Sequence, residues 1–346
     1  MDNLFPDGFE IVCARRHGDA RRDANIVYRL TSLIGTGSFA DVFAVETNHN
    51  EVVSGGGGGG SARKALPRLL CAKVDHALRQ TADNFSILQH ELLVFQAIAK
   101  AHRTHQPERL RYFAEVVDFG KLADGRHFMI MERVGKQTLG DVGVHALPVQ
   151  FALSCAQQAC RALRAVHRAG FVHRDVKPDN FMVEQMRNGC VHLWLIDFGF
   201  AKRFVARDGT HIHNAKKEHV TGTLEFLSCH ALFGFESSRR CDLESLCYTL
   251  AFTLHPNQQL PWSDSIADVR EEDMDDAFLT ALGHRKHKTD ARELFGADTP
   301  AHACFRRVLR TARALKFAQA PPFDDLDTVF TDAIAASSPS SHPHSS

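Results

Sequence analysis

The chain has 346 residues, with 44% hydrophobic and 24% charged side chains, a balance typical of an ordinary soluble globular protein. Its 41 Lys and Arg residues are matched by 41 Asp and Glu residues, so no overall charge recruits nucleic acid or an anionic membrane. No apolar run approaches the ~18 residues that span a bilayer, and residues 1–10 lack the apolar core of a signal peptide, so we expect no membrane association.

The nine cysteines are odd in number and include no Cys-x-x-Cys pair, which argues against a disulfide framework or a zinc site. A reducing compartment fits this usage best. We therefore expect an intracellular, cytoplasmic protein, with entry into the nucleus left open. The length suits two lobes, since one domain usually has ~100–200 residues.

A strand, a glycine-rich turn and a second strand are predicted over residues 28–43. Glycines such as Gly35 and Gly37 let backbone N–H groups approach phosphate oxygens without a Cβ atom in the way. A Gly-x-Gly pattern by itself is equally typical of a plain hairpin. Ala40 stands where the nucleotide-binding turn has a third glycine, and we expect its methyl group to restrict the backbone and to lower nucleotide affinity without abolishing binding.

A flexible insertion is expected at residues 54–61, where six consecutive glycines have no side chains to pack. The next strand is predicted at residues 69–74 and carries Lys73. A lone Lys on a strand is usually an exposed edge charge. Here Ala72 directly precedes Lys73, and this setting together with the upstream glycine turn favours phosphate binding.

A helix is predicted over residues 84–100, because Leu88, Phe95 and Ile98 repeat at helical spacing. Glu91 occupies the missing place in that apolar face. A carboxylate there is costly unless a cation meets it, and Lys73 is the natural partner. The alternative is a helix edge at which Glu91 reaches water.

Residues 126–135 are interpreted as a strand that runs into a hinge, and residues 148–169 as a core helix that stops at Gly170. Short strands are predicted at residues 181–183 and 192–196, on either side of a turn at residues 187–189.

The most informative run is His173-Arg174-Asp175-Val176-Lys177-Pro178-Asp179-Asn180, followed by Asp197-Phe198-Gly199. Phosphoryl transfer from a nucleotide requires a carboxylate base, a cation on the moving phosphoryl group and oxygen ligands for Mg²⁺. Asp175 supplies the base, Lys177 the cation, and Asn180 with Asp197 the metal ligands. A solvated charged turn broken by Pro178 is the alternative, but the offsets of Lys177 and Asn180 from Asp175 favour the catalytic loop.

This run resembles the catalytic loop of a Ser/Thr protein kinase. Together with Val220-Thr221-Gly222-Thr223 and Glu236-Ser237-Ser238-Arg239-Arg240-Cys241-Asp242-Leu243-Glu244, it is similar to the casein kinase 1 family. The resemblance implies an α+β, bilobal fold with a small, mostly β N-lobe that has one key helix and a larger, mostly α C-lobe. The corresponding divisions are an N-terminal extension at 1–27, the N-lobe at 28–134, the C-lobe at 135–330 and a disordered tail at 331–346.

The resemblance also implies Mg-ATP as co-substrate, Ser or Thr of proteins as acceptor, and a monomer. It pairs Lys73 with Glu91, lets Thr223 bridge Asp175 and Lys177, and lets Asp242 bind the backbone of the catalytic loop. The residues expected to contact ATP are Ile34, Gly35, Thr36, Gly37, Ser38, Phe39, Ala40, Asp41, Val42, Ala72, Lys73, Met131, Glu132, Val134 and Asp141.

Two departures from the family bear on function. Glu218 and Glu225 stand where family members have cations that bind an acidic or phosphorylated residue of the substrate, although Lys216 and Lys217 could partly compensate. We therefore expect no preference for acidic or phospho-primed sites. The resemblance to the family separately implies no need for activating phosphorylation. Ser228-Cys229-His230 keeps only the serine of the family's Ser-Ile-Asn triplet. A catalytically weak nucleotide-binding scaffold and a small-molecule kinase are the alternative functions.

Overall fold

The structure is a computed structural model and describes residues 8–13, 26–48, 69–76, 86–105, 112–143, 147–187, 189–206, 208–217, 219–267, 269–270, 273–296 and 298–337. The chain divides into two compact units. Unit 1 comprises Met1–Phe95 and Ala114–Val134, and unit 2 comprises Gln96–Phe113 and Gly135–Ser346. The predicted glycine-rich insertion at 54–61 lies outside the described residues.

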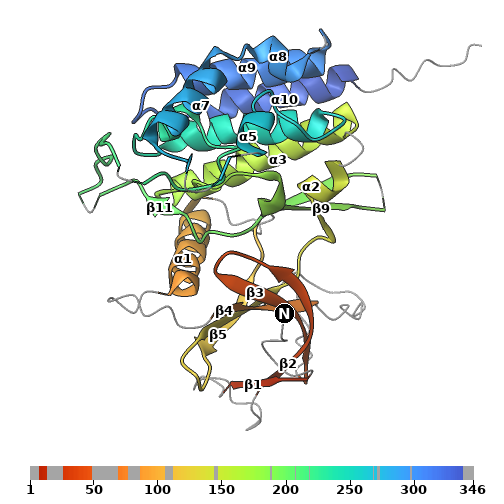
Figure 1. The fold of residues 1–346 in the computed structure, drawn as a ribbon. Coiled ribbons are helices and arrows are strands. Elements are labelled where there is room, and N and C mark those ends of the chain that lie inside the picture. Colours follow the sequence, from red (N-terminus) through yellow and green to blue (C-terminus); the bar gives the residue numbers. More distant parts are fainter. Residues whose placement is uncertain are drawn as a thin grey trace, which may run out of the picture. The chain divides into compact units, whose positions relative to one another are not determined.

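Unit 1 is built on a six-stranded antiparallel sheet in the order β1-β2-β3-β4-β6-β5 (Figure 1). The strands are β1 (Glu10–Cys13), β2 (Ile26–Thr36), β3 (Ala40–Thr47), β4 (Leu70–Asp75), β5 (Val116–Lys121) and β6 (His127–Glu132). Large apolar side chains from neighbouring strands, among them Tyr28, Phe43, Phe128 and Ile130, pack into one cluster. Successive side chains of a strand point to opposite faces, so alternate positions supply this cluster.

Strand β1 was not predicted, and it lies within residues 1–27, the range interpreted as an N-terminal extension. It pairs with β2 from Glu10 opposite Arg29 to Cys13 opposite Ile26, and Ile11 is buried. The sheet therefore begins inside that range. A strand this short does not show enough alternation to be recognised from its sequence.

Helix α1 (Ile87–His105) begins after Ser86, whose hydroxyl accepts a hydrogen bond from the N–H of Gln89 at 3.2 Å. The predicted face is confirmed, because Leu88, Phe95 and Ile98 are all buried and Glu91 is buried among them.

Unit 2 is mainly helical. Its helices are α2 (Leu139–Val142), α3 (Val149–Arg168), α4 (Cys229–Leu232), α5 (Arg239–Leu254), α6 (Asp264–Ala267), α7 (Asp276–Lys288), α8 (Ala291–Phe295), α9 (Pro300–Ala314) and α10 (Phe323–Ser337). Helix α5 is buried on all sides, and α3 packs against both α5 and α10 (Figure 1). A helix without a polar face belongs in the middle of a core.

Short strands frame the informative run of the sequence. Helix α3 ends at Ala169, and Gly170 then takes the positive φ of +85° that stops a helix, as predicted. Strand β8 (Phe171–Val172) follows and pairs with β11 (Lys202–Arg203). A second sheet contains β7 (Gln137–Thr138), β9 (Phe181–Gln185) and β10 (Val191–Leu195).

Two boundaries differ from the sequence expectations. The apolar residues after Asp242 favour a helix that begins there, but α5 begins at Arg239, with Ser238 as its cap, so Asp242 is the fourth residue of its first turn. Residues 331–337, predicted to be part of a disordered tail, belong to helix α10, whose Phe330 and Ala333 are buried. The predicted start of the tail is too early, because the polar residues after α10 hide where the helix ends. Residues 338–346 lie outside the described residues.

In the part of the chain that the structure describes, no helix is both long enough and apolar enough to cross a membrane.

Candidate active site

The glycine-rich turn and Lys73 lie on adjacent strands of unit 1. Gly35 on β2 is opposite Val42 on β3, and Val42 is in turn opposite Lys73 on β4. Thr36, Gly37 and Ser38 are exposed, Phe39 is partly exposed and Ile34 is 39% exposed, so the turn is open to a ligand. The pairing of the strands thus places the glycine-rich turn and Lys73 on neighbouring strands at the same level of the sheet.

Ala40 has a backbone conformation that any residue tolerates, and its expected effect on nucleotide affinity stays a prediction. It is not among the described non-glycine residues with positive φ, and its side chain is buried where β3 begins. A methyl group is tolerated in ordinary extended backbone. Next to it, Asp41 is buried and lies 3.2 Å from His76 Nε2, a partner that the sequence did not indicate.

Lys73 and Glu91 form the predicted ion pair. The Nζ atom of Lys73 lies 2.8 Å from Oε2 of Glu91, and the two side chains are 14% and 1% exposed. A pair this buried is expensive to break, because either charge alone would be left without compensation. The alternative in which Glu91 reaches water is therefore wrong.

The remaining residues expected to contact ATP lie in different settings. Ala72 and Met131 are buried in unit 1 on β4 and β6. The N–H of Glu132 is bonded to the carbonyl of Glu115 at 2.8 Å, so only its carbonyl group remains for a nucleotide. Val134 is the last residue of unit 1. Asp141 belongs to unit 2, where its carboxylate accepts hydrogen bonds from the N–H and hydroxyl of Thr138, the N-cap residue of α2, and so completes a capping box.

Asp175 is the best-supported carboxylate in unit 2. Its Oδ1 atom accepts hydrogen bonds from the N–H and hydroxyl of Thr223 at 2.9 and 2.8 Å. Its Oδ2 atom lies 3.1 Å from Nζ of Lys177 and 3.2 Å from Nδ2 of Asn180. Lys177 also donates to the Thr223 hydroxyl, so the predicted bridge between Asp175 and Lys177 is present.

Asn180 and Asp197, the predicted metal ligands, are held next to each other. The N–H of Ile196 donates to the carbonyl of Asn180 at 2.9 Å, which places Asp197 one residue beyond it. Asn180 uses its Nδ2 group on the carbonyl and Oδ2 of Asp175, so its amide oxygen is the side-chain atom that would bind a metal ion. An amide oxygen and a carboxylate are the hard ligands that Mg²⁺ prefers, so the pair fits this ion. The described residues contain no cluster of three or more His, Cys, Asp or Glu side chains that would hold a metal unaided.

Asp242 supports the catalytic loop from α5, as predicted. Its carboxylate accepts hydrogen bonds from the N–H groups of His173 and Arg174 at 2.8 and 2.9 Å. It also bonds Nε2 of His167 at 2.8 Å, a contact that no motif indicated. Burial would raise the pKa of Asp242, but the hydrogen bond and charge of His167 and the backbone bond of Arg174 hold it below its ordinary value. The loop is therefore anchored to a permanent anion.

Comparison with known proteins decides the family. Residues 71–302 match the family described as protein kinase domain. The chain belongs to the protein kinase family. It is also 32% identical over 232 residues to Casein kinase 1-like protein HD16 of Oryza sativa subsp. japonica. That match covers 65% of this chain and 30% of the relative, so the chain corresponds to less than a third of that protein.

The kinase fold and the resemblance to casein kinase 1 proteins are thus confirmed, with a mainly β unit 1 and a mainly helical unit 2. In this kinase-family chain, Lys73, Glu91 and the glycine-rich turn belong to unit 1. Asp175, Lys177, Asn180, Asp197 and Thr223 belong to unit 2.

Of the two acidic residues that replace the family's cations, Glu218 and Glu225, the structure describes only Glu225. Glu218 lies outside the described residues. Glu225 turns its carboxylate to the hydroxyl of Ser263, and burial raises its pKa. Lys217, which could replace a missing cation, lies 3.9 Å from the carboxylate of Glu236, to which Lys202 is also bonded.

Proposed function

We propose that the chain is a Ser/Thr protein kinase that transfers the γ-phosphoryl group of Mg-ATP to hydroxyl groups of protein substrates. The observation that carries this proposal is the setting of Asp175, whose two carboxylate oxygens are each fixed by a different pair of donors. A general base must be held within reach of the proton that it accepts, and this carboxylate has little freedom to turn.

Each of the other residues has a role in that reaction. Asp175 accepts the proton of the acceptor hydroxyl as its oxygen attacks the γ-phosphorus. Lys177 offers a positive charge beside the moving phosphoryl group, and Lys73, fixed by Glu91, binds the phosphates that stay behind. Backbone N–H groups of the glycine-rich turn would serve the same phosphates, apart from that of Gly37, which donates to the carbonyl of Ala40 at 2.9 Å. Mg²⁺, held by Asn180 and Asp197, would neutralise charge on the phosphate oxygens.

We propose further that acidic or phosphorylated sites are not preferred. The carboxylate of Glu225 occupies a position that needs a cation for such substrates, and Lys217 already has Glu236 as its counter-ion. An intracellular, cytoplasmic monomer remains our proposal for the state of the protein.

Transfer of radiolabel from γ-labelled ATP to casein tests the proposal. We expect the wild-type chain to label Ser or Thr, and Asp175→Asn to lose about a hundredfold or more of kcat, the usual contribution of a general base. Asp179→Asn is the matched control, since Asp179 is an exposed carboxylate of the same loop. Equal labelling by wild type and Asp175→Asn, or label on Tyr alone, would contradict the proposal.

A further inference from the structure

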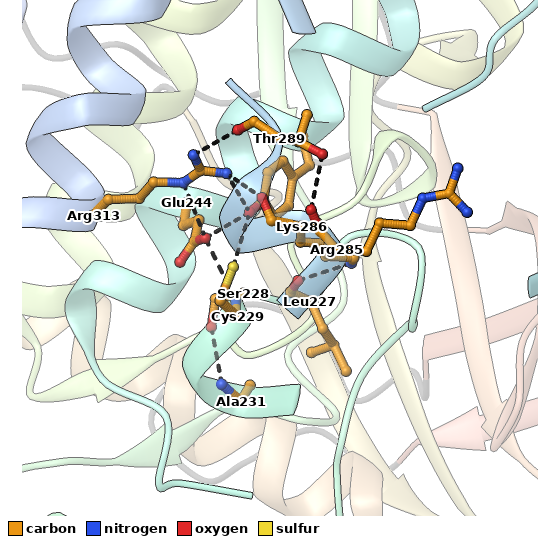
Figure 2. A network of polar contacts seen from close by, with 10 residues as sticks. Leu227, Ser228, Cys229, Ala231, Glu244, Arg285, Lys286, Thr289 and Arg313 are labelled. Atoms are coloured by element: carbon orange, nitrogen blue, oxygen red, sulfur yellow. Dashed lines mark hydrogen bonds and ion pairs between the residues drawn. The ribbon is translucent and has the colours of Figure 1, made fainter. Parts of the chain in front are cut away.

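Lys286 on α7 is a lysine with no exposed surface, and its ammonium group binds only backbone oxygens among the contacts described. The Nζ atom donates to the carbonyls of Leu224, Glu225 and Leu227 at 2.6, 2.9 and 2.9 Å. Figure 2 shows this side chain reaching the main chain at Leu227. Three carbonyls of one turn therefore converge on one cation.

The contacts of Lys286 match the ammonium form of its side chain, although the net effect of its surroundings is to lower its pKa to about 7. Nζ lies 5.2 Å from the ring centroid of Tyr248 and 4.8 Å from that of Trp262, close enough for cation–π attraction. Burial lowers the pKa of Lys286, while Cys229, Glu225 and Glu244 oppose that shift. A neutral amine has two N–H donors, so only the ammonium form satisfies all three carbonyls.

The turn that Lys286 holds is continuous with Thr223. The carbonyl of Thr223 accepts hydrogen bonds from the N–H groups of Phe226 and Leu227 at 2.9 and 3.1 Å, which closes residues 223–227 into a compact turn. On its other side Thr223 donates two hydrogen bonds to Asp175. A displacement of this turn is therefore transmitted to the carboxylate that we assign as the base.

Lys286 is itself firmly placed. Arg313 on α9 donates to the carbonyls of Lys286 and Thr289 at 2.7 and 2.9 Å, as Figure 2 shows, and its Nε atom lies 3.7 Å from the buried carboxylate of Glu244. Trp262 adds a second anchor to the turn, because its Nε1–H donates to the carbonyl of Glu225 at 2.9 Å. The turn thus rests on α7 and on the segment after α5, two parts of the helical core.

We propose that Lys286 is a positioning residue for phosphoryl transfer, which fixes the turn at residues 223–227 so that Thr223 stays bonded to Asp175 and the acceptor protein meets a preformed surface. This inference rests on the proposed function. It assigns Lys286 to the acceptor side of the reaction, and it leaves the binding of ATP to residues of unit 1.

The test compares Lys286→Met with Lys288→Met, using a casein-derived Ser peptide and ATP as substrates. Met keeps the length of the side chain and removes the ammonium group, while Lys288 is an exposed lysine at the end of the same helix. We expect Lys286→Met to raise KM for the peptide and to lower kcat/KM at least tenfold, since a small misplacement can cost ~100-fold. KM for ATP should stay within twofold of that of Lys288→Met.

The two Michaelis constants separate positioning from simple loss of folded protein. A smaller folded fraction lowers kcat and leaves both constants unchanged. If Lys286→Met does not fold, Trp262→Phe replaces it, since this variant keeps an aromatic ring and removes the hydrogen bond to Glu225. For it we expect a smaller rise in the peptide KM, with faster hydrogen exchange at residues 223–228 and unchanged exchange in α5.

The outcomes are distinguishable. If wild type and Lys288→Met transfer no phosphate to any peptide, the proposed function fails. If both are active and the Lys286 and Trp262 variants match them in the peptide KM, Lys286 has no positioning role. Faster exchange throughout α5 would likewise overturn the inference, because it would show a general effect on the core.

Discussion

Glu91 is a carboxylate on a helix face whose other buried members are apolar, and its ion pair with Lys73 compensates its burial. The sequence contained both halves of this pair, because the helical spacing exposed the anomaly at Glu91 and the strand context identified Lys73. The energetic weight of the pair follows from burial, which favours a single arrangement of both side chains.

Glu91→Gln should lower kcat by about a hundredfold and destabilise the chain by about 3 kcal/mol, because it leaves the ammonium group of Lys73 without its counter-ion. Steady-state kinetics and urea unfolding measure the two effects. Glu46→Gln, an exposed Glu on β3, is the control and should change neither. A wild-type kcat for the Glu91→Gln variant would show that the pair of Lys73 with Glu91 is not needed for the reaction.

Motif spacing predicted the residues of the site better than it predicted their partners. Asp175, Lys177 and Thr223 were expected together, and they are bonded together. His167 and Lys286 were missed, because each bonds a partner on another element that lies far away in the sequence, and neither belongs to a recognisable motif. Contacts of buried charges depend on tertiary packing, which a single sequence does not display.

At the scale of elements, the segment from Gly222 to Leu227 is shaped by a backbone conformation that only glycine adopts readily. Gly222 has φ of +114°, and an added Cβ atom would lie 2.5 Å from the carbonyl oxygen of Arg174. The sequence predicted this segment from its Thr-Gly-Thr motif. It did not predict the close approach to the catalytic loop, which is set by the tertiary fold.

Gly222→Ala should separate this segment from the catalytic loop and lower kcat/KM for a peptide at least tenfold, since the new methyl group meets backbone that cannot move aside. Gly209→Ala is the matched control, because Gly209 also has a positive φ, of +85°, but its added Cβ atom meets nothing within 4 Å. Peptide kinetics at equal folded concentration distinguish them. Equal losses in both variants would mean that backbone strain, and not the contact with Arg174, decides.

At the scale of the whole chain, α10 is part of the helical core and not an appendage. Arg161 on α3 forms two hydrogen bonds with Asp327, at 2.6 and 2.9 Å, and Leu326 and Phe330 are buried. The fold class followed from the resemblance to the casein kinase 1 family, and the longer helices and strands of residues 28–196 followed from periodicity and glycine stops. The two ends of the fold, β1 and α10, did not, because short or polar-flanked elements give weak patterns.

Phe330→Ala should lower the free energy of unfolding by about 3–5 kcal/mol, since a fully buried ring is replaced by a cavity. Asp332→Ala, at an exposed position of the same helix, should leave stability nearly unchanged. Urea unfolding followed by circular dichroism gives both values. A midpoint for Phe330→Ala equal to that of Asp332→Ala would show that α10 does not belong to the cooperative core.

Glu236 supplies a negative charge to the segment around the catalytic loop from an unmodified side chain. Its carboxylate is bonded to Lys202, lies 3.9 Å from Lys217 and interacts with Arg174. Burial would raise the pKa of Glu236, but Lys202, Lys217 and the N–H of Ser237 hold it below the ordinary value. Phosphatases cannot remove a side-chain carboxylate. This balance of charge is therefore complete as soon as the polypeptide has folded, without an added phosphate group.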